Sequence, residues 1–223
     1  MNDARHDQAP TPSPIDLATW NRASYFERYL GTDLPYIIIT ASVDVTNLLA
    51  FTREHDVSSY IAMVWAGHRA ARSIVNFRYR IRDERPVMFD TIYPCFTYMQ
   101  PGADLFILVT MDFDDDLLAF DAKAKAHIAA QGSDPGWDDA VAKAGATVGY
   151  SGVPWIKFTH VTRTIMKLGV DSAPKITWGK YYAEGDRTLC SLSVQTHHGL
   201  MDGIHVGKYY EEFQRNIDEL PTR

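Results

Sequence analysis

The sequence has few cysteines, no long apolar run and no leader-like start. Cys95 and Cys190 are its two cysteines; each lies among apolar or aromatic residues, without CxxC spacing, so we expect both reduced and buried in the core. No stretch approaches the ~20 consecutive apolar residues that cross a bilayer, so we expect no membrane contact. The first residues, MNDARHDQAPTPSP, have no apolar core after their charges, so we expect neither a signal peptide nor an anchor, and we expect a cytoplasmic protein.

Positive charge is also scarce. The chain has 22 Lys and Arg against 28 Asp and Glu, a formal net charge of −6, and no basic run that would bind nucleic acid. We therefore expect no nucleic-acid partner. Basic residues gather in FRYRIRDER, where they alternate with Phe77, Tyr79 and Ile81, and this pattern predicts a strand with one solvated face.

The rest of the composition is that of an ordinary globular protein, with 46% hydrophobic and 22% charged residues. A chain of 223 residues is long enough for one sizeable core and short for two, so we expect a single domain over residues 15–223. Residues 1–14 are rich in proline and polar residues, and we expect them to form a flexible N-terminal tail.

Hydrophobic periodicity predicts helices and strands that do not alternate regularly. Helical spacing occurs over residues 17–30 (before Gly31), 46–56 (after a Thr46 cap), 58–75 (after paired serines), 115–132 and 202–220. Strand patterns occupy residues 36–45, 77–81, 86–99, 104–113, 146–162, 175–183 and 187–198, with a turn at 184–186. This order favours an α+β fold with helices on one face of a mixed or antiparallel sheet.

The junction between the last strand and the last helix carries two histidines, in the sequence QTHHGLMDG over residues 195–203. A histidine that follows a strand lies at a sheet end, where a ligand can reach it, and imidazole transfers protons near neutral pH. Asp202 either orients a histidine or caps the helix that follows. Residue types alone leave catalysis, structural histidines and a metal site without an obvious third ligand all open.

This junction resembles the HHxxxDG signature of chloramphenicol acetyltransferases, which also occurs in condensation domains of peptide synthetases and, in related form, in dihydrolipoyl acyltransferases. Condensation domains contain two such halves, and dihydrolipoyl acyltransferases usually carry lipoyl modules, so this single half is most similar to the first family. Further blocks resemble that family from residue 20 to the C-terminus: WxR…F at 20–26, VDVT at 43–46, FR at 77–78, YPxFT at 93–97, SxxPW at 151–155, and EGDR…LSVQ at 184–195.

The resemblance implies an α+β two-layer sandwich, with a mixed sheet and helices on one face, that assembles as a homotrimer with active sites between subunits. It implies an O-acetyltransferase of the kind found among resistance enzymes, which uses acetyl-CoA as co-substrate and no metal. The acceptor would be a hydroxyl of chloramphenicol or a similar small molecule. Two alternatives remain: an acyltransferase with a longer or carrier-bound acyl donor, and a non-catalytic trimeric binding protein of the same fold.

The resemblance also assigns the catalytic residues. His198, the second histidine of the pair, would be the general base that lets the acceptor hydroxyl attack the thioester directly, without an acyl-enzyme. Ser151, the first residue of SxxPW, would donate a hydrogen bond to the tetrahedral oxyanion. Thr177 would help to hold a water at the same oxyanion.

Other matched positions support the site. Asp202 would pair with Arg22 and brace the catalytic segment, which leaves His197 as a structural neighbour. Trp155 and Tyr181 match positions near the coenzyme or its channel, although core packing is an equal interpretation for both aromatic residues.

Two arginines depart from the family pattern. Arg163 stands where the resistance enzymes tend to have an apolar pocket side chain, and Arg28 stands beside Tyr29, which matches a residue on the acceptor side. A guanidinium favours a ligand with a carboxylate, phosphate or carbonyl group, unless it points to solvent or pairs with an acid. The resemblance therefore determines the acceptor less well than the catalytic residues.

Overall fold

The computed structural model describes the whole chain except residues 1–5, 7, 168 and 222–223. Seven strands of the described residues form the main sheet. Six of them follow the order β2-β10-β8-β7-β5-β6, and the seventh, β9, pairs with β10. β5, β7 and β8 run parallel and the other neighbours antiparallel, so the sheet is mixed. The strands are β2 (Tyr36–Asp44), β5 (Tyr93–Met99), β6 (Phe106–Thr110), β7 (Thr147–Gly152), β8 (Lys175–Trp178), β9 (Tyr182–Glu184) and β10 (Arg187–His197).

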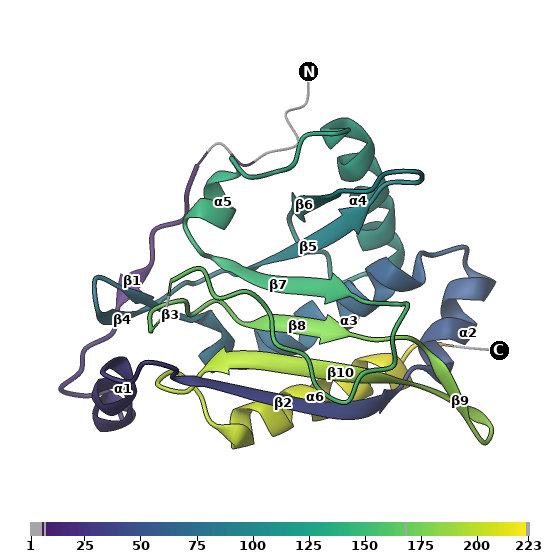
Figure 1. Cartoon of the computed structure of the whole chain (residues 1–223). Helices are drawn as coiled ribbons and strands as arrows, with labels where there is room; N and C mark the ends of the chain where they lie inside the picture. The colour runs from purple at the N-terminus through teal and green to yellow at the C-terminus, as the bar shows by residue number, and fades with distance from the viewer. Residues whose placement is uncertain (1–5, 7, 168, 222–223) are drawn as a thin grey trace.

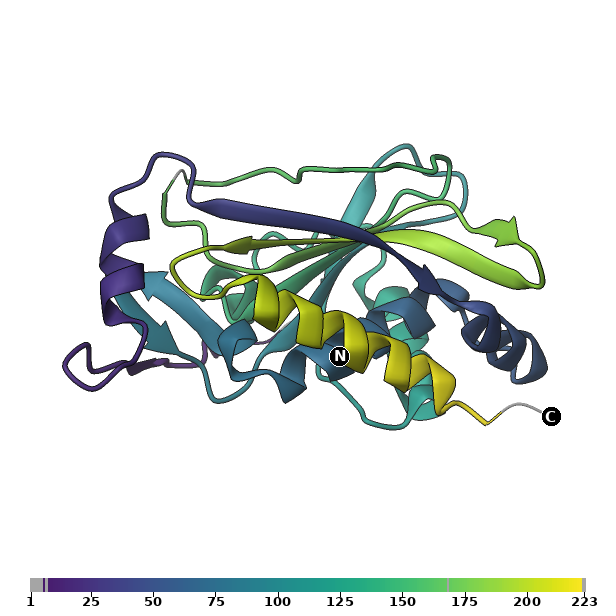
Figure 2. The same cartoon turned by 90° about the horizontal axis from the view of Figure 1, so that it is seen from below.

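The helices gather against one face of this sheet, as Figure 2 shows for α3, α4 and α6. They are α2 (Thr46–Glu54), α3 (Ser59–Ser73), α4 (Leu117–Gln131) and α6 (Gly203–Asp218). The core lies between the two layers, where buried side chains of alternate strand residues such as Phe96, Val148 and Tyr150 meet the buried faces of α3 and α6. A mixed sheet with packed helices is the α+β class that the sequence predicts.

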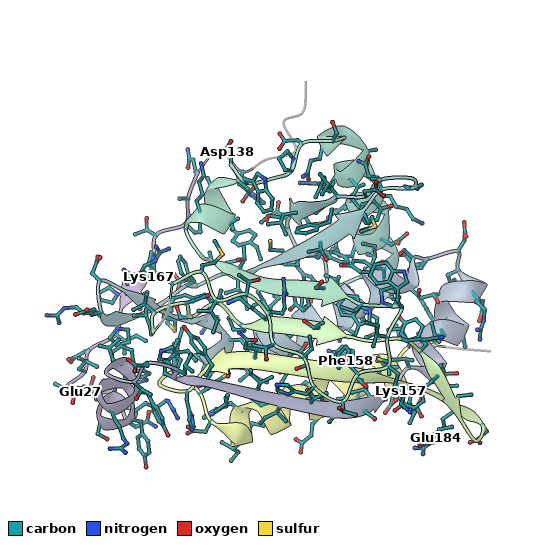
Figure 3. All side chains as sticks on the ribbon, in the orientation of Figure 1. Glu27, Asp138, Lys157, Phe158, Lys167 and Glu184 are labelled. Carbon is teal, nitrogen blue, oxygen red and sulfur yellow. The ribbon has the colours of Figure 1, made fainter. Side chains whose placement is uncertain are left out.

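The opposite face of the sheet is polar, and the segment after β7 crosses it (Figure 1). Ser191 and Ser193 of β10 donate hydrogen bonds to the carbonyl oxygens of Phe158 and Val161, at 2.5 and 3.4 Å. Figure 3 shows Lys157 and Phe158 along this segment, in front of the sheet. The alternation of β10 therefore gives an apolar face to the core and a hydroxyl-rich face that holds the crossing segment.

The first described residues contact the domain. Ser13 and Pro14 form β1 and pair with β4 (Arg85–Met88), which also pairs with β3 (Tyr79–Arg82). His6 hydrogen-bonds to Asp139, just before α5 (Ala140–Lys143), with Nδ1 and Oδ2 3.0 Å apart. The flexible tail expected over residues 1–14 stays a prediction, because residues 1–5 and 7 lie outside the described residues. The contacts of His6, Ser13 and Pro14 depend on backbone pairing and on two ion pairs of His6, and such contacts leave no hydrophobic period in the sequence.

Two local predictions of helix starts were wrong. The helix expected over residues 17–30 begins at Ala23 (α1, Ala23–Leu30) and ends, as expected, at Gly31. Thr46 is the first residue of α2 rather than its cap, and its hydroxyl accepts the Thr188 N–H at 2.7 Å. The cap expected at the start of α3 is confirmed, since Ser58 accepts the Ile61 N–H. No helix of the described residues is long and apolar enough to span a bilayer.

The solvated face expected for the FRYRIRDER strand is wrong at Arg80, which is 2% exposed. Arg80 follows the 3₁₀ turn η1 (Val75–Arg78). The Arg80 guanidinium donates to the carbonyl oxygens of Phe77, Gly145 and Thr147, at 2.9, 2.8 and 2.6 Å. Burial lowers the pKa of Arg80 to about 9. Alternation predicts which residues share a face of the strand. It does not predict whether that face is exposed, and here main-chain carbonyls from other segments cover it.

Candidate active site

His198 lies directly after β10, in the short turn that leads to α6. Its backbone N–H donates to the Pro35 carbonyl at 2.7 Å, which ties the turn to the residue before β2. At the start of α6 the Asp202 N–H donates to His205 Nδ1 at 2.9 Å. These main-chain contacts fix the turn, so the position of the His198 ring follows from the backbone path.

Of the two ring nitrogens of His198, only Nδ1 has a partner among the described residues. Nδ1 lies 3.2 Å from the Met201 carbonyl oxygen and 3.2 Å from Asp202 Oδ1, and both oxygens can only accept a hydrogen bond. The neutral ring therefore carries its proton on Nδ1, which leaves the lone pair on Nε2. The Tyr29 ring stacks on the imidazole at 4.2 Å between centroids, and 28% of the His198 side chain stays exposed. This geometry suits a general base.

Arg22 and Asp202 form a two-pronged ion pair beside this turn. Nη1 contacts Oδ2 at 2.5 Å and Nη2 contacts Oδ1 at 3.0 Å. Nη2 of Arg22 also donates to the His198 carbonyl oxygen at 3.1 Å. The hydrogen bond from Arg22 holds the pKa of Asp202 below its ordinary value. The pair therefore connects the N-terminal segment to both ends of the histidine turn.

His197 differs from its neighbour because both of its ring nitrogens are already used. Nε2 donates to the Gly169 carbonyl at 3.0 Å, and Nδ1 accepts the Gly199 N–H at 3.1 Å. The residue is 1% exposed, and burial lowers the pKa of its imidazole. A neutral ring without a free nitrogen cannot act as a base, so His197 is a structural residue.

Ser151 lies near the end of β7, on the polar face of the sheet. Its Oγ is 3.0 Å from Thr97 Oγ1 on β5, and its β8 neighbour Thr177 has a buried hydroxyl without a hydrogen-bond partner among the described residues. A cavity of about 450 Å³ opens here. It is lined by Tyr60, Thr97, Tyr98, Met99, Phe106, Ser151, Gly152, Val153, Pro154 and Trp155.

The other predicted ligand-binding residues occupy different environments. Trp155 is 68% exposed at the cavity, so its interpretation as a core residue is wrong. Tyr181 packs against the core, and burial raises its pKa. Arg28 is exposed on α1. The described residues contain no group of three or more His, Cys, Asp or Glu side chains arranged to hold a metal ion.

His198 and Ser151 do not meet within one chain. Ser151 is in register with Thr177, which is in register with Ser193 of β10. From Ser193 to His198 the chain advances five residues, or roughly 16 Å at 3.3 Å per strand residue. Figure 1 shows β7 and β10 pointing to opposite ends of the sheet. The structure thus gathers His198, Asp202, Arg22 and Tyr29 at one end, and Ser151, Thr177 and Trp155 at the other.

Sequence reasoning gave no role to Tyr60 or Thr97. The Tyr60 hydroxyl donates to the Thr97 carbonyl oxygen beside the Ser151 cavity, and burial raises the pKa of Tyr60 to about 12. Thr97 is the last residue of the YPxFT block, and this family match was the one feature of the sequence that pointed to it. Tyr60 is one of several apolar and aromatic residues that begin α3, and helical periodicity predicts for it only a contact with the core.

Comparison with known proteins gives one consistent result. A family model described as chloramphenicol acetyltransferase matches residues 12–214. A chloramphenicol acetyltransferase of Streptomyces acrimycini is 31% identical over 206 residues, which is 92% of this chain and 94% of that protein. One from Escherichia coli is 27% identical and covers 92% of this chain and 93% of its own.

Solved structures agree with this. A chloramphenicol acetyltransferase structure aligns with a TM-score of 0.85 and 25% identity, over 93% of this chain and 100% of the other. The dihydrolipoamide acetyltransferase of Azotobacter vinelandii aligns with a TM-score of 0.63 at 15% identity, over 95% of this chain and 98% of the other, and so shares the fold.

Proposed function

This chain belongs to the chloramphenicol acetyltransferase family and is an acetyltransferase; we propose that it transfers acetyl from acetyl-CoA to a hydroxyl of chloramphenicol or a chloramphenicol-like small molecule. The observation that carries the proposal is the contact between His198 Nδ1 and the Met201 carbonyl, while Nε2 has no partner in the part of the chain that the structure describes. Nε2 accepts the acceptor's hydroxyl proton, the oxygen attacks the thioester carbonyl, and the proton then passes to the departing thiolate of coenzyme A. A direct attack needs no acyl-enzyme.

The tetrahedral intermediate places negative charge on the former carbonyl oxygen. A hydroxyl donor fixed where this charge develops stabilises the transition state more than the ground state. Ser151 is that donor in our proposal, since Thr97 Oγ1, 3.0 Å away, can hold its hydroxyl in place. The buried Thr177 hydroxyl on the next strand has no partner among the described residues and is suited to hold a water at the same oxyanion. The exposed Trp155 lines the adjoining cavity, where we place part of the coenzyme.

We further propose that a complete site needs two copies of the chain. The separation of His198 from Ser151, roughly 16 Å along β10 alone, is too large for one hydroxyl and one thioester to contact both. If His198 of one copy meets Ser151 of the next, a head-to-tail ring forms, and a homotrimer is the closed ring we expect. The exposed aromatic residues Tyr25 and Trp155, near the two halves of the site, are suited to such an interface.

A mixture of two inactive variants tests both parts of this proposal. His198→Ala and Ser151→Ala proteins are purified separately and then unfolded and refolded together, with each protein refolded alone as a control. Random mixing in a head-to-tail ring gives about a quarter of the sites both intact residues, so thiol release from acetyl-CoA should return to about a quarter of the wild-type rate. A mixture no more active than the average of its components would show that each site lies within one chain.

The donor is tested in the same assay. Acetyl-CoA is compared with butyryl-CoA and octanoyl-CoA at a fixed chloramphenicol concentration, and the ratio of kcat/KM values reports the acyl length that fits the transition state. We expect acetyl-CoA to be the best donor. A preference for octanoyl-CoA would assign the chain to transfer of longer acyl groups.

A further inference from the structure

The side chain of Arg163 lies on the same sheet face as Ser151. Its backbone is held by Gln195 of β10, whose Oε1 accepts the Arg163 N–H at 2.8 Å. From there the guanidinium reaches across β8 to β7, where its Nη1 lies 3.3 Å from the position that a Cβ on Gly149 would take. Gly149 precedes Ser151 by two residues and so faces the same side of the sheet. The absence of a side chain at Gly149 leaves room for the guanidinium.

One donor atom of the Arg163 guanidinium is unsatisfied within the described chain. Nη1 is buried and has no hydrogen-bond partner among the described residues. Burial lowers the pKa of this guanidinium, and the neighbouring groups that favour its charge are Cys95, Tyr60 and Asp171. Asp171 accepts a hydrogen bond from Lys175 Nζ at 2.7 Å, and the Lys175 cation shares its charge. A buried donor without an acceptor is costly, so this position is suited to an oxygen that arrives with a ligand.

We propose that Arg163 binds an oxyanion, a carboxylate or phosphate, on the hydroxyl-bearing acceptor, and so selects anionic acceptors over neutral ones. The inference rests on the proposed acetyl transfer at Ser151 and adds the charge of its substrate. Along β7, Gly149 and Ser151 are about 6.6 Å apart, a separation that one aromatic ring with para substituents can bridge. The planar guanidinium matches a carboxylate or phosphate in two-pronged geometry, and an oxyanion supplies the acceptor that Nη1 lacks.

The test compares acceptors that share one benzyl alcohol and differ in the para group, which is anionic or neutral. 4-(Hydroxymethyl)benzoate, 4-(hydroxymethyl)phenyl phosphate and the neutral methyl ester of the benzoate each present one primary hydroxyl. We expect kcat/KM with acetyl-CoA to be at least about tenfold higher for an anion than for the ester. The better of the two anions identifies which oxyanion fits. Equal rates for the ester and both anions would overturn the proposal.

Three variants assign the preference to Arg163. Arg163→Gln should abolish it by lowering kcat/KM for the anions more than for the methyl ester, and Arg163→Lys should retain part of it. Gly149→Ala crowds Nη1 without removing the charge, so it should weaken the preference even if Arg163→Gln does not fold. Equal losses on the anions and the ester in these variants would make Arg163 a structural residue.

Binding to the His198→Ala protein, measured by calorimetry, separates this inference from the proposed chemistry. Tighter binding of an anion than of the ester supports the Arg163 site whether or not turnover occurs, and equal binding opposes it. If no acceptor causes thiol release from acetyl-CoA with the wild-type protein, the proposed acetyl transfer fails on its own.

Discussion

Replacing Arg22 by methionine should lower the free energy of unfolding by about 2 kcal/mol, because the change removes two hydrogen bonds to Asp202 and one to the His198 carbonyl. Removing one partner of a fully buried pair costs about 3–5 kcal/mol, whereas an exposed pair contributes about 0–1 kcal/mol. The Arg22 side chain is 10% exposed and that of Asp202 is 35% exposed, which places this pair between the two limits.

A double-mutant cycle measures the interaction directly. Urea unfolding is followed for the wild type, Arg22→Met, Asp202→Asn and the double variant, all at one protein concentration because assembly also stabilises a chain. We expect the double variant to lose about 1–2 kcal/mol less than the sum of the single losses. Additive losses, within about 0.3 kcal/mol, would refute the reasoning, since the two residues would then contribute independently.

The pH dependence of the cycle gives a second check. The pKa of Asp202 is lower in the folded protein than in the unfolded chain, so the unfolded state binds more protons as the pH falls. The contribution of the pair is therefore fully present above the unfolded pKa, about 3.9, and is lost as the pH falls through the lower folded value. The coupling energy should stay constant between pH 8 and pH 5. If the coupling energy disappeared in this range, the coupling would depend on the titration of another group, such as His205, and not on Asp202.

Further predictions concern catalysis and the core. His198→Ala should lower kcat by at least about 10²-fold while thermal unfolding stays unchanged, and a loss under about tenfold in steady-state rates would exclude it as the base. Ser151→Ala should lower kcat by about 10²-fold, whereas a raised KM with unchanged kcat would make it a binding residue. Burial lowers the pKa of His68 to about 3. Below the unfolded pKa of about 6.5 the unfolded chain therefore binds a proton that the folded protein does not, and the free energy of unfolding falls by about 1.4 kcal/mol per pH unit. Urea unfolding of His68→Gln at pH 7 and 5.5 should lack this slope; an unchanged slope would contradict the assignment.

Local patterns predicted the helices well where one face is apolar. The spacing of Val206, Tyr210, Phe213, Ile217 and Leu220 predicted the last helix, and all but Tyr210 are buried where α6 packs on the sheet and α3. Tyr210 is partly buried and packs against the core, and its hydroxyl donates to Leu192. Periodicity succeeds here because the core-facing side of a helix is determined by its own sequence.

Contacts between distant segments were not predictable in the same way. Strand patterns placed His198 at a strand end and Ser151 within the extended segment 146–162, but the strand order β2-β10-β8-β7 determines that the two residues lie apart. Strand order depends on which segments pair across the whole chain, and no single segment carries this information. The burial of Arg80 likewise depends on carbonyl oxygens as far away as Thr147. The motif match named candidate site residues without giving their arrangement in one chain.

The proton on His198 Nδ1 is directed by a main-chain oxygen, and this has a consequence for redesign. A mutation library at position 201 changes a side chain but leaves the carbonyl that orients the imidazole. Met201 is 2% exposed in the core, so a change to another apolar residue of similar size is compatible with the same orientation of the His198 ring, whereas a polar residue there would disturb the core. Gly199 is the sensitive position instead, because a Cβ there would lie 3.1 Å from the His197 ring and displace the backbone that carries both histidines. Directed evolution toward new acceptors should leave Gly199 fixed and vary residues around the Ser151 cavity.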